Sequence, residues 1–174
     1  LLCFMFSLSF AETLTKHYPQ YDLVLNFSDG KAAAMKNEHW GYINSTGEAI
    51  IPLIYDAVDD KFNDGLEKKK KNGLWGYINE SGQPIIPFEY ENLADFKEGA
   101  SAAQKNGKWG FIDKKGNTII PFLFDSHGFF EHGVCIISRN GKYGVITRQN
   151  QILFPFQYDK IYDFINGAAI AEIN

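Results

Sequence analysis

Two histidines are the first side chains of this sequence that invite a chemical interpretation. His127 and His132 have Glu131 between them, and imidazole and carboxylate groups are common metal ligands. Their spacing is neither the i, i+4 of a helical metal pair nor the i, i+2 of one strand face. In the sequence repeat described below, His127 occupies a core position and His132 a turn position. We therefore predict that no metal binds here.

Cys135 is the one thiol outside the apolar first residues, because the other cysteine is Cys3. A single thiol forms neither an intramolecular disulfide nor a cysteine zinc site. Nucleophilic catalysis would also need a base beside the thiol. We interpret Cys135 as a small strand residue and predict no catalytic residue and no cofactor. Its repeat position is filled elsewhere by Ala32, Glu67, Ser101 and Ala169.

Charged side chains offer a third kind of chemistry, the binding of a charged partner. A basic residue precedes each of four predicted hairpin turns, at Lys36, Lys71, Lys105 and Arg139. An acid follows each of four predicted bends, at Asp56, Glu91, Asp125 and Asp159. Stacked repeats would align these positions in columns. The columns either pair with each other and solubilise the strand ends, or bind an acidic partner. For the second case the predicted binding residues are Lys71, Lys105 and Arg139, with the run Lys68 to Lys70.

The elements that position these residues belong to a tandem repeat with a step of 34 or 35 residues. One marker is the aromatic-glycine pair, at Trp40-Gly41, Trp75-Gly76, Trp109-Gly110 and Tyr143-Gly144. The others are Phe27, Phe62, Phe96, Phe130 and Phe164, and Pro52, Pro87, Pro121 and Pro155. A fixed period of this size indicates one supersecondary unit that is duplicated and stacked on its neighbours.

One repeat contains three short apolar runs separated by turn signals. Asn106-Gly107 favours a two-residue type I′ hairpin, because both central positions need a positive φ. Asp113 to Gly116 favours a three-residue hairpin that closes on a left-handed residue. Each unit is therefore predicted as a meander of three antiparallel strands, followed by a bend such as Pro121 to Asp125. The predicted fold is all-β, an extended and twisted stack, with closure into a propeller as the alternative.

The aromatic-glycine pair is predicted to serve packing. Alternate strand residues share a face, so Trp109 and Phe111 form one aromatic stripe. Gly110 would weaken a strand unless a ring or a backbone lies against it. Apolar residues on both strand faces, including the aliphatic pair Ile119-Ile120, are what stacked units require. An aromatic groove that binds sugar or peptide is the alternative use of such rings.

These residues resemble the WG-repeat family, also called KWG-repeat proteins. The resemblance rests on Asn72 to Asn79 with Gly82, Ile86-Pro87 and Tyr90-Glu91, and it recurs from Asn106 to Asp125. It covers about residues 27 to 174. Members of the family are mostly bacterial and are regarded as interaction modules without a shared catalytic activity, so the resemblance implies a scaffold. The first repeat lacks the turn glycine at Asn37 to His39, and Tyr143 replaces tryptophan in the fourth.

Composition and the two ends suggest the domain organisation. Residues 1–11 are uncharged and end in Ser9-Phe10-Ala11, which is typical of a signal peptide remnant and predicts a secreted or periplasmic protein. A lead-in of residues 12–26 follows, and then repeats at 27–61, 62–95, 96–129, 130–163 and, in part, 164–174, as in a fragment of a longer array. The net charge of −4 argues against nucleic acid. No membrane span is expected in the mature chain.

Three classes of function are left by these observations. The first is a non-catalytic scaffold that binds a protein or an anionic polymer of the cell envelope. The second is a structural spacer of the envelope, and the third is an enzyme, which the absence of a catalytic constellation disfavours. An exposed aromatic or charged patch along one face would distinguish a scaffold from a spacer.

Overall fold

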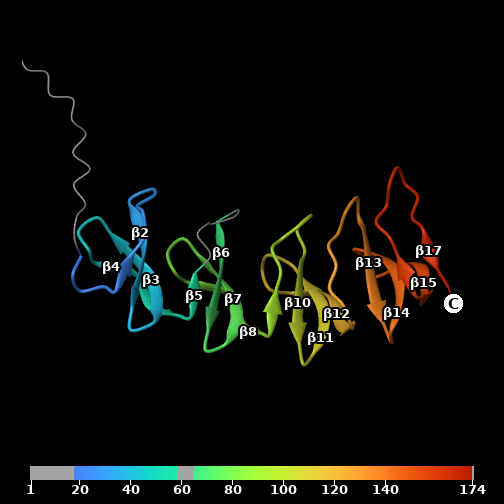
Figure 1. The fold of residues 1–174 in the computed structure, drawn as a ribbon, viewed down its shortest axis with the longest axis horizontal. Helices are drawn as coiled ribbons and strands as arrows, with labels where there is room; N and C mark the ends of the chain where they lie inside the picture. Colours follow the sequence, from blue (N-terminus) through green and yellow to red (C-terminus); the bar gives the residue numbers. More distant parts are fainter. Residues whose placement is uncertain (1–17, 59–64, 174) are drawn as a thin grey trace, which may run out of the picture.

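The computed structural model describes residues 18–58 and 65–173. They form small antiparallel β-sheets stacked in an open row, with the first and last sheets at opposite ends (Figure 1). The all-β fold and its extended stack are thus confirmed, and the row does not close. The predicted signal peptide remnant, Cys3 and Phe62 lie outside the described residues. The described part of the chain has no helix with the length and hydropathy that crossing a membrane requires.

Each sheet is built from strands that are consecutive in the chain. The first contains β1 (Leu23–Val24), β2 (Lys31–Lys36), β3 (His39–Asn44) and β4 (Ala49–Tyr55). The second contains β5 (Ala57–Val58), β6 (Leu66–Lys71), β7 (Leu74–Asn79) and β8 (Pro84–Tyr90). The third contains β9 (Asn92–Leu93), β10 (Ser101–Lys105), β11 (Lys108–Ile112) and β12 (Thr118–Phe124). The fourth contains β13 (Val134–Arg139), β14 (Lys142–Thr147) and β15 (Ile152–Tyr158), and β16 (Lys160–Ile161) pairs with β17 (Ala171–Glu172).

The first three sheets carry a short edge strand in addition to the three that the sequence predicts. This strand follows directly on an acid, which is Asp22 in the first sheet and the acid after a predicted bend, Asp56 or Glu91, in the next two. In the third sheet, the backbone N–H of Glu91 donates to Gln104 O at 2.9 Å, and Asn92 and Leu93 then pair with β10. Two residues are too few to show the alternation of apolar and polar residues that reveals a strand in the sequence. The strand forms because the backbone of β10 offers hydrogen-bond partners to its N–H and C=O groups.

The proline lies within the last strand of each of the first four sheets, so the predicted bend is found at the acid that follows the strand and not at the proline. Trp109 pairs with Phe124 and Phe111 with Ile120, so that β12 carries extra residues opposite Gly110. This bulge brings backbone against the glycine, and a Cβ at Gly110 would meet Ile120 O at 2.7 Å. Proline suits the bulge because it has no N–H to offer a ladder. The predicted close approach at glycine is therefore a carbonyl of the neighbouring strand.

The hairpin turns have the backbone that their residues predict. Asn106 and Gly107 have φ values of 53° and 71°, both in the left-handed region. In the first sheet Asn37 and Glu38 adopt φ values of 51° and 65°, so Glu38 takes a conformation that glycine adopts more easily. Asn150 replaces the glycine of the second turn at a φ of 60°.

Neighbouring sheets pack through apolar faces with one recurring pair of rings. Tyr90 of β8 lies 6.1 Å from Phe122 of β12, measured between ring centroids. The same pairing joins Tyr55 to Phe88 and Phe124 to Phe156. Beside each pair lies an aliphatic residue, and Ile51, Ile86 and Ile120 are 1%, 0% and 0% exposed. The core is thus a series of equivalent layers between sheets.

The free face of the first sheet is covered by residues from the lead-in. Tyr18 is buried and packs with Ala32, Ala34 and Ile43. Its hydroxyl donates to Ser45 O at 2.9 Å, and the Tyr21 hydroxyl donates to Gly47 O at 2.9 Å. This end of the stack is therefore closed by the chain itself.

Candidate functional site

The predicted basic column lies along the hairpin ends, where two of its members have partners. Lys105 Nζ lies 3.0 Å from Glu89 Oε2 and 6.0 Å from the centre of the Tyr90 ring. The Arg139 guanidinium lies 4.9 Å from the centre of the Phe156 ring. Lys71 is partly buried at the end of β6. Lys105 is thus engaged with the preceding sheet and Arg139 with its own, which reduces what these two cations offer to an acidic ligand.

The run Lys68 to Lys70 is not a patch of free charge. Lys68 Nζ lies 2.7 Å from Asp95 Oδ1 in the next sheet. Lys69 has no exposed surface. Lys68 and Lys70 both place their ammonium groups within 6 Å of the Trp75 ring, at 5.7 Å and 5.5 Å. The interpretation of this run as a local positive surface is therefore wrong for Lys69, because its side chain points into a junction.

The acids after the predicted bends bind the hairpin turns and not the basic column. The backbone N–H groups of Gly73, Gly107 and Gly141 donate to Asp56, Glu91 and Asp125 at 2.7, 3.0 and 2.9 Å. Lys108 Nζ also lies 2.6 Å from Asp125 Oδ1. The hydrogen bond from Lys108, followed by that from Gly141, holds the pKa of Asp125 below its ordinary value. Each acid thus ties the start of one sheet to that sheet's hairpin turn.

A buried ionic cluster lies between the first and second sheets. Glu67 and Lys69 of β6 both have fully buried side chains and form a direct ion pair. The Tyr42 hydroxyl of the first sheet donates to Glu67 Oε1 at 2.6 Å, and Lys69 Nζ lies 4.7 Å from the Tyr42 ring centre. Burial raises the pKa of the Glu67 carboxyl, against the opposing effect of Lys69. The sequence analysis did not predict this cluster. It could have been suspected because Glu67 and Lys69 occupy repeat positions that alanine occupies in the first repeat.

The last strands of the sheets carry a row of exposed apolar side chains, which we call the edge row. Its members lie two residues before or two residues after the proline of their strand and are Ile50 (45% exposed), Ile54 (38%), Ile85 (39%), Leu123 (51%) and Leu153 (49%). Ile119, at the position of Ile50 in the third sheet, is partly buried. The exposed bulge prolines lie between them along each strand. Glu89 and Gln157 stand at the position of Ile54 in the other two strands. Single exposed apolar residues are common, but these recur at two repeat positions that share one face of the last strand.

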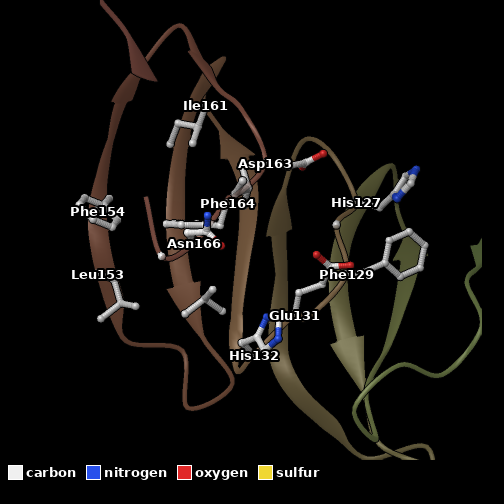
Figure 2. Close-up of a pocket in the computed structure, with 14 residues that line it drawn as sticks. His127, Phe129, Glu131, His132, Leu153, Phe154, Ile161, Asp163, Phe164 and Asn166 are labelled. Carbon is white, nitrogen blue, oxygen red and sulfur yellow. The ribbon is translucent and has the colours of Figure 1, made fainter. Parts of the chain in front are cut away.

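A groove of about 920 Å³ lies between the fourth sheet and the segment that includes β16 and β17. Apolar lining comes from Ile136, Leu153 and Phe154, and from Ile161 and Phe164. In the view of Figure 2, Leu153 and Phe154 lie at one end, His127 and Phe129 at the other, and Phe164 and Asn166 between them. Sequence reasoning missed this groove. The sequence feature that could have indicated it is Val145. At the equivalent position of the two preceding repeats, Tyr77 and Phe111 pack their rings against the phenylalanine of the following repeat, and valine has no ring to do so.

The histidines and the cysteine have different environments. His127 is exposed, with its ring 4.8 Å from that of Trp109, so its predicted core position is wrong. The backbone next to His127 differs from the other repeats at Gly128. It packs so closely there that a Cβ on Gly128 would meet Ile136 O at 2.5 Å. His132 has a φ of 52° and lies in a turn, as predicted. Cys135 is 1% exposed, and burial raises the pKa of its thiol to about 12.

Comparison with known proteins identifies the repeat. A family model described as a WG containing repeat matches residues 18–38, 40–74, 75–109, 109–143 and 143–174. No curated protein matches the chain. Among the described residues, no group of three or more histidine, cysteine or acidic side chains is arranged to hold a metal ion.

Proposed function

The chain belongs to the WG-repeat family, and from this membership we propose that it is a non-catalytic scaffold that binds a protein partner through the edge row. The observation that carries the proposal is that each of the four sheets with a proline strand exposes at least one aliphatic side chain two residues from that proline. A partner with a complementary apolar strip could contact several repeats at once, and its affinity would rise with each contact.

The bulge prolines favour contact through side chains over the addition of a strand. Within residues 18–58 and 65–173, β4, β8, β12 and β15 are each paired on one side only, which leaves a backbone edge. Proline removes a donor from that edge and discourages pairing with another chain. Ile50 and Ile54 on either side of Pro52, and Ile85 before Pro87, are then the features that a partner would recognise.

An anionic envelope polymer is the weaker candidate, because the cations that would bind it have partners within the protein. Lys105 contacts Glu89, and Lys68 contacts Asp95. Catalysis is disfavoured by the same kind of argument. A thiol with a pKa of about 12 is protonated at neutral pH and is a poor nucleophile. The leader-like residues 1–11 support action outside the cytoplasm, which detection of their cleavage would test.

The proposal is tested by affinity capture from the source cells, followed by binding measurements with the purified captured protein. Ile85→Asp combined with Leu123→Asp should abolish binding, while Leu74→Asp should leave it intact. Leu74 is also exposed and apolar but lies outside the edge row. Binding by the native chain should change little between low and moderate salt. Binding that falls steeply with salt and disappears in Lys71→Glu/Lys105→Glu would support the polymer instead. No specific binding to either would favour a spacer.

A further inference from the structure

We propose that Asn166 is a site of spontaneous deamidation, whereas carboxylates of the stack protect the three hairpin asparagines from the same reaction. The sequence contains four Asn-Gly pairs, which begin at Asn72, Asn106, Asn140 and Asn166. The co-reactants are hydroxide and water, and the products are aspartate or isoaspartate together with ammonia. The proposal concerns the turns and does not depend on the edge row.

The reaction begins at the backbone nitrogen of the residue that follows asparagine. Hydroxide removes the amide proton, and the resulting anion attacks the side-chain carbonyl carbon of the asparagine. A new C–N bond closes a succinimide ring, while the bond to the side-chain nitrogen breaks and that nitrogen takes a proton from water and leaves as ammonia. Water then opens the ring at either carbonyl. Glycine favours the attack because it has no side chain beside its nitrogen.

The four pairs have the same backbone conformation and the same access to water. Each pair forms the two central residues of a two-residue turn. In chain order, the asparagines have φ values of 52°, 53°, 53° and 51°, and the glycines have φ values of 79°, 71°, 74° and 79°. All of these residues are exposed. Turn geometry and exposure therefore do not distinguish Asn166 from the other three.

The three hairpin pairs differ from Asn166 in the partner of the glycine N–H. This N–H donates to a carboxylate at 2.7 to 3.0 Å, with Gly73 bound to Asp56, Gly107 to Glu91 and Gly141 to Asp125. A carboxylate in this position holds the proton on the nitrogen, and its negative charge repels the anion that the reaction requires. We expect this like charge to lower the fraction of the attacking anion by about tenfold or more.

The turn of Asn166 belongs to a different column, in which the acceptor comes from the preceding repeat. Glu98 shows the arrangement, because its carboxylate accepts from the N–H groups of His132 and Gly133 at 2.7 and 3.0 Å. His132 stands at the position of Glu98 in the next repeat and brings an imidazole in place of a carboxylate. Among the described residues, no acceptor binds the N–H of Gly167. A replacement inside the stack thus leaves this asparagine unprotected.

The first test compares the four sites within the native 174-residue chain. The protein is incubated at mildly alkaline pH, and peptide mapping by mass spectrometry measures aspartate and isoaspartate at each site over time. Asn166 should be converted about tenfold or more faster than the three hairpin asparagines. In concentrated urea, where the carboxylates no longer bind the turns, the four rates should converge. Equal rates in the folded protein, or the same inequality in urea, would overturn the proposal.

The second test separates the effect of the carboxylate from that of local flexibility. His132→Glu supplies a carboxylate where Glu98 has one and should slow the conversion of Asn166. His132→Gln is the matched control without charge and should leave the rate unchanged. If His132→Glu does not slow the reaction, or if His132→Gln slows it equally, the proposal is wrong, because the mobility of the turn and not the charge would then set the rate.

The third test removes a carboxylate from a protected turn. Glu91→Gln keeps an oxygen acceptor for the N–H of Gly107 but removes the charge, and it should accelerate the conversion of Asn106 by about tenfold or more. Asn72 in the same variant is the internal control and should keep its rate. An unchanged rate at Asn106 would overturn the proposal. Since the comparison within the native chain needs no variant, it decides the proposal even where a variant does not fold.

Discussion

At the scale of single residues, the same two positions of the repeat hold charged side chains in one sheet and small or apolar side chains in others. The positions of Glu67 and Lys69 are occupied by Ala32 and Ala34 in the first sheet and by Cys135 and Ile137 in the fourth. Each of these residues faces the preceding sheet or the lead-in that covers the first one. At one junction a buried ion pair therefore takes the place of the apolar contact found at the others. Its contribution to the free energy of unfolding can be compared with that of an apolar pair at the same positions.

We expect Glu67→Ala to lower the free energy of unfolding by about 3 to 5 kcal/mol, because it leaves the buried charge of Lys69 without its carboxylate. The double change Glu67→Leu/Lys69→Met removes both charges at similar volume and should restore most of this loss. Urea unfolding of both variants and the native protein provides the comparison. If the double variant is less stable than Glu67→Ala, the ion pair itself stabilises the junction and this expectation is wrong.

Gly110 illustrates a residue whose role is fixed by the backbone of its neighbour. We expect Gly110→Val to cost about 3 kcal/mol, since the new side chain would overlap Ile120 O at 2.7 Å and Phe122 N at 3.0 Å. Lys115→Ala should cost less than about 0.5 kcal/mol, because Lys115 is exposed and its backbone N–H keeps its bond to Asp113. Equal shifts of the urea midpoint would refute the packing role of Gly110.

At the scale of elements, the acid that begins each sheet is a connector. It enters from the last strand of one sheet and binds the hairpin turn of the next, as Asp125 binds Gly141 N–H at 2.9 Å. The carboxylate accepts a hydrogen bond from a backbone N–H of the turn that is not part of the strand pairing. The acid columns of the sequence therefore mark joints between sheets, and their alignment follows from the repeat.

The lowered pKa of Asp125 predicts a dependence of stability on pH. A carboxyl whose pKa is lower in the folded state adds stability above its unfolded pKa and loses it as pH falls through the folded value. Asp125→Asn should therefore be less stable than the native protein at pH 7, and the difference should shrink below about pH 4. Thermal unfolding between pH 2.5 and 7 measures this difference. A constant difference over that range would mean that the charge of Asp125 contributes nothing.

At the scale of the whole molecule, the sequence predicts the architecture better than the surfaces. The step of 34 or 35 residues, the Asn-Gly turns and the alternation around Trp109 suffice for an all-β stack. The bulge at Pro121 was not predictable, because pairing between Phe111 and Ile120 depends on how two strands meet. The predicted surface position of Lys69 is wrong because contacts between sheets decide its burial, whereas register alone placed it in a charged run.

The aliphatic pair before each proline shows the same limit. The pattern indicates that Ile85 and Ile86 point to opposite faces, which is correct. Ile86 is fully buried by the third sheet, whereas Ile85 is 39% exposed in the edge row. Which of the two apolar faces becomes buried depends on how each sheet is displaced relative to the next. This displacement arises only when the sheets are stacked, so it cannot be deduced from one strand.

The consecutive order of the strands determines how the protein should respond to tension. Strands run across the long axis of the row, and one passage of the chain joins each sheet to the next (Figure 1). A force applied to the two ends would open each sheet from its edge, one hydrogen-bonded pair after another, and would not shear all pairs together. Optical tweezers should record successive low-force steps, each releasing about 11 to 12 nm for 34 residues. A single rupture of the full length would contradict this expectation. If the steps occur, the stack behaves as an extensible tether whose length adjusts in units of one repeat.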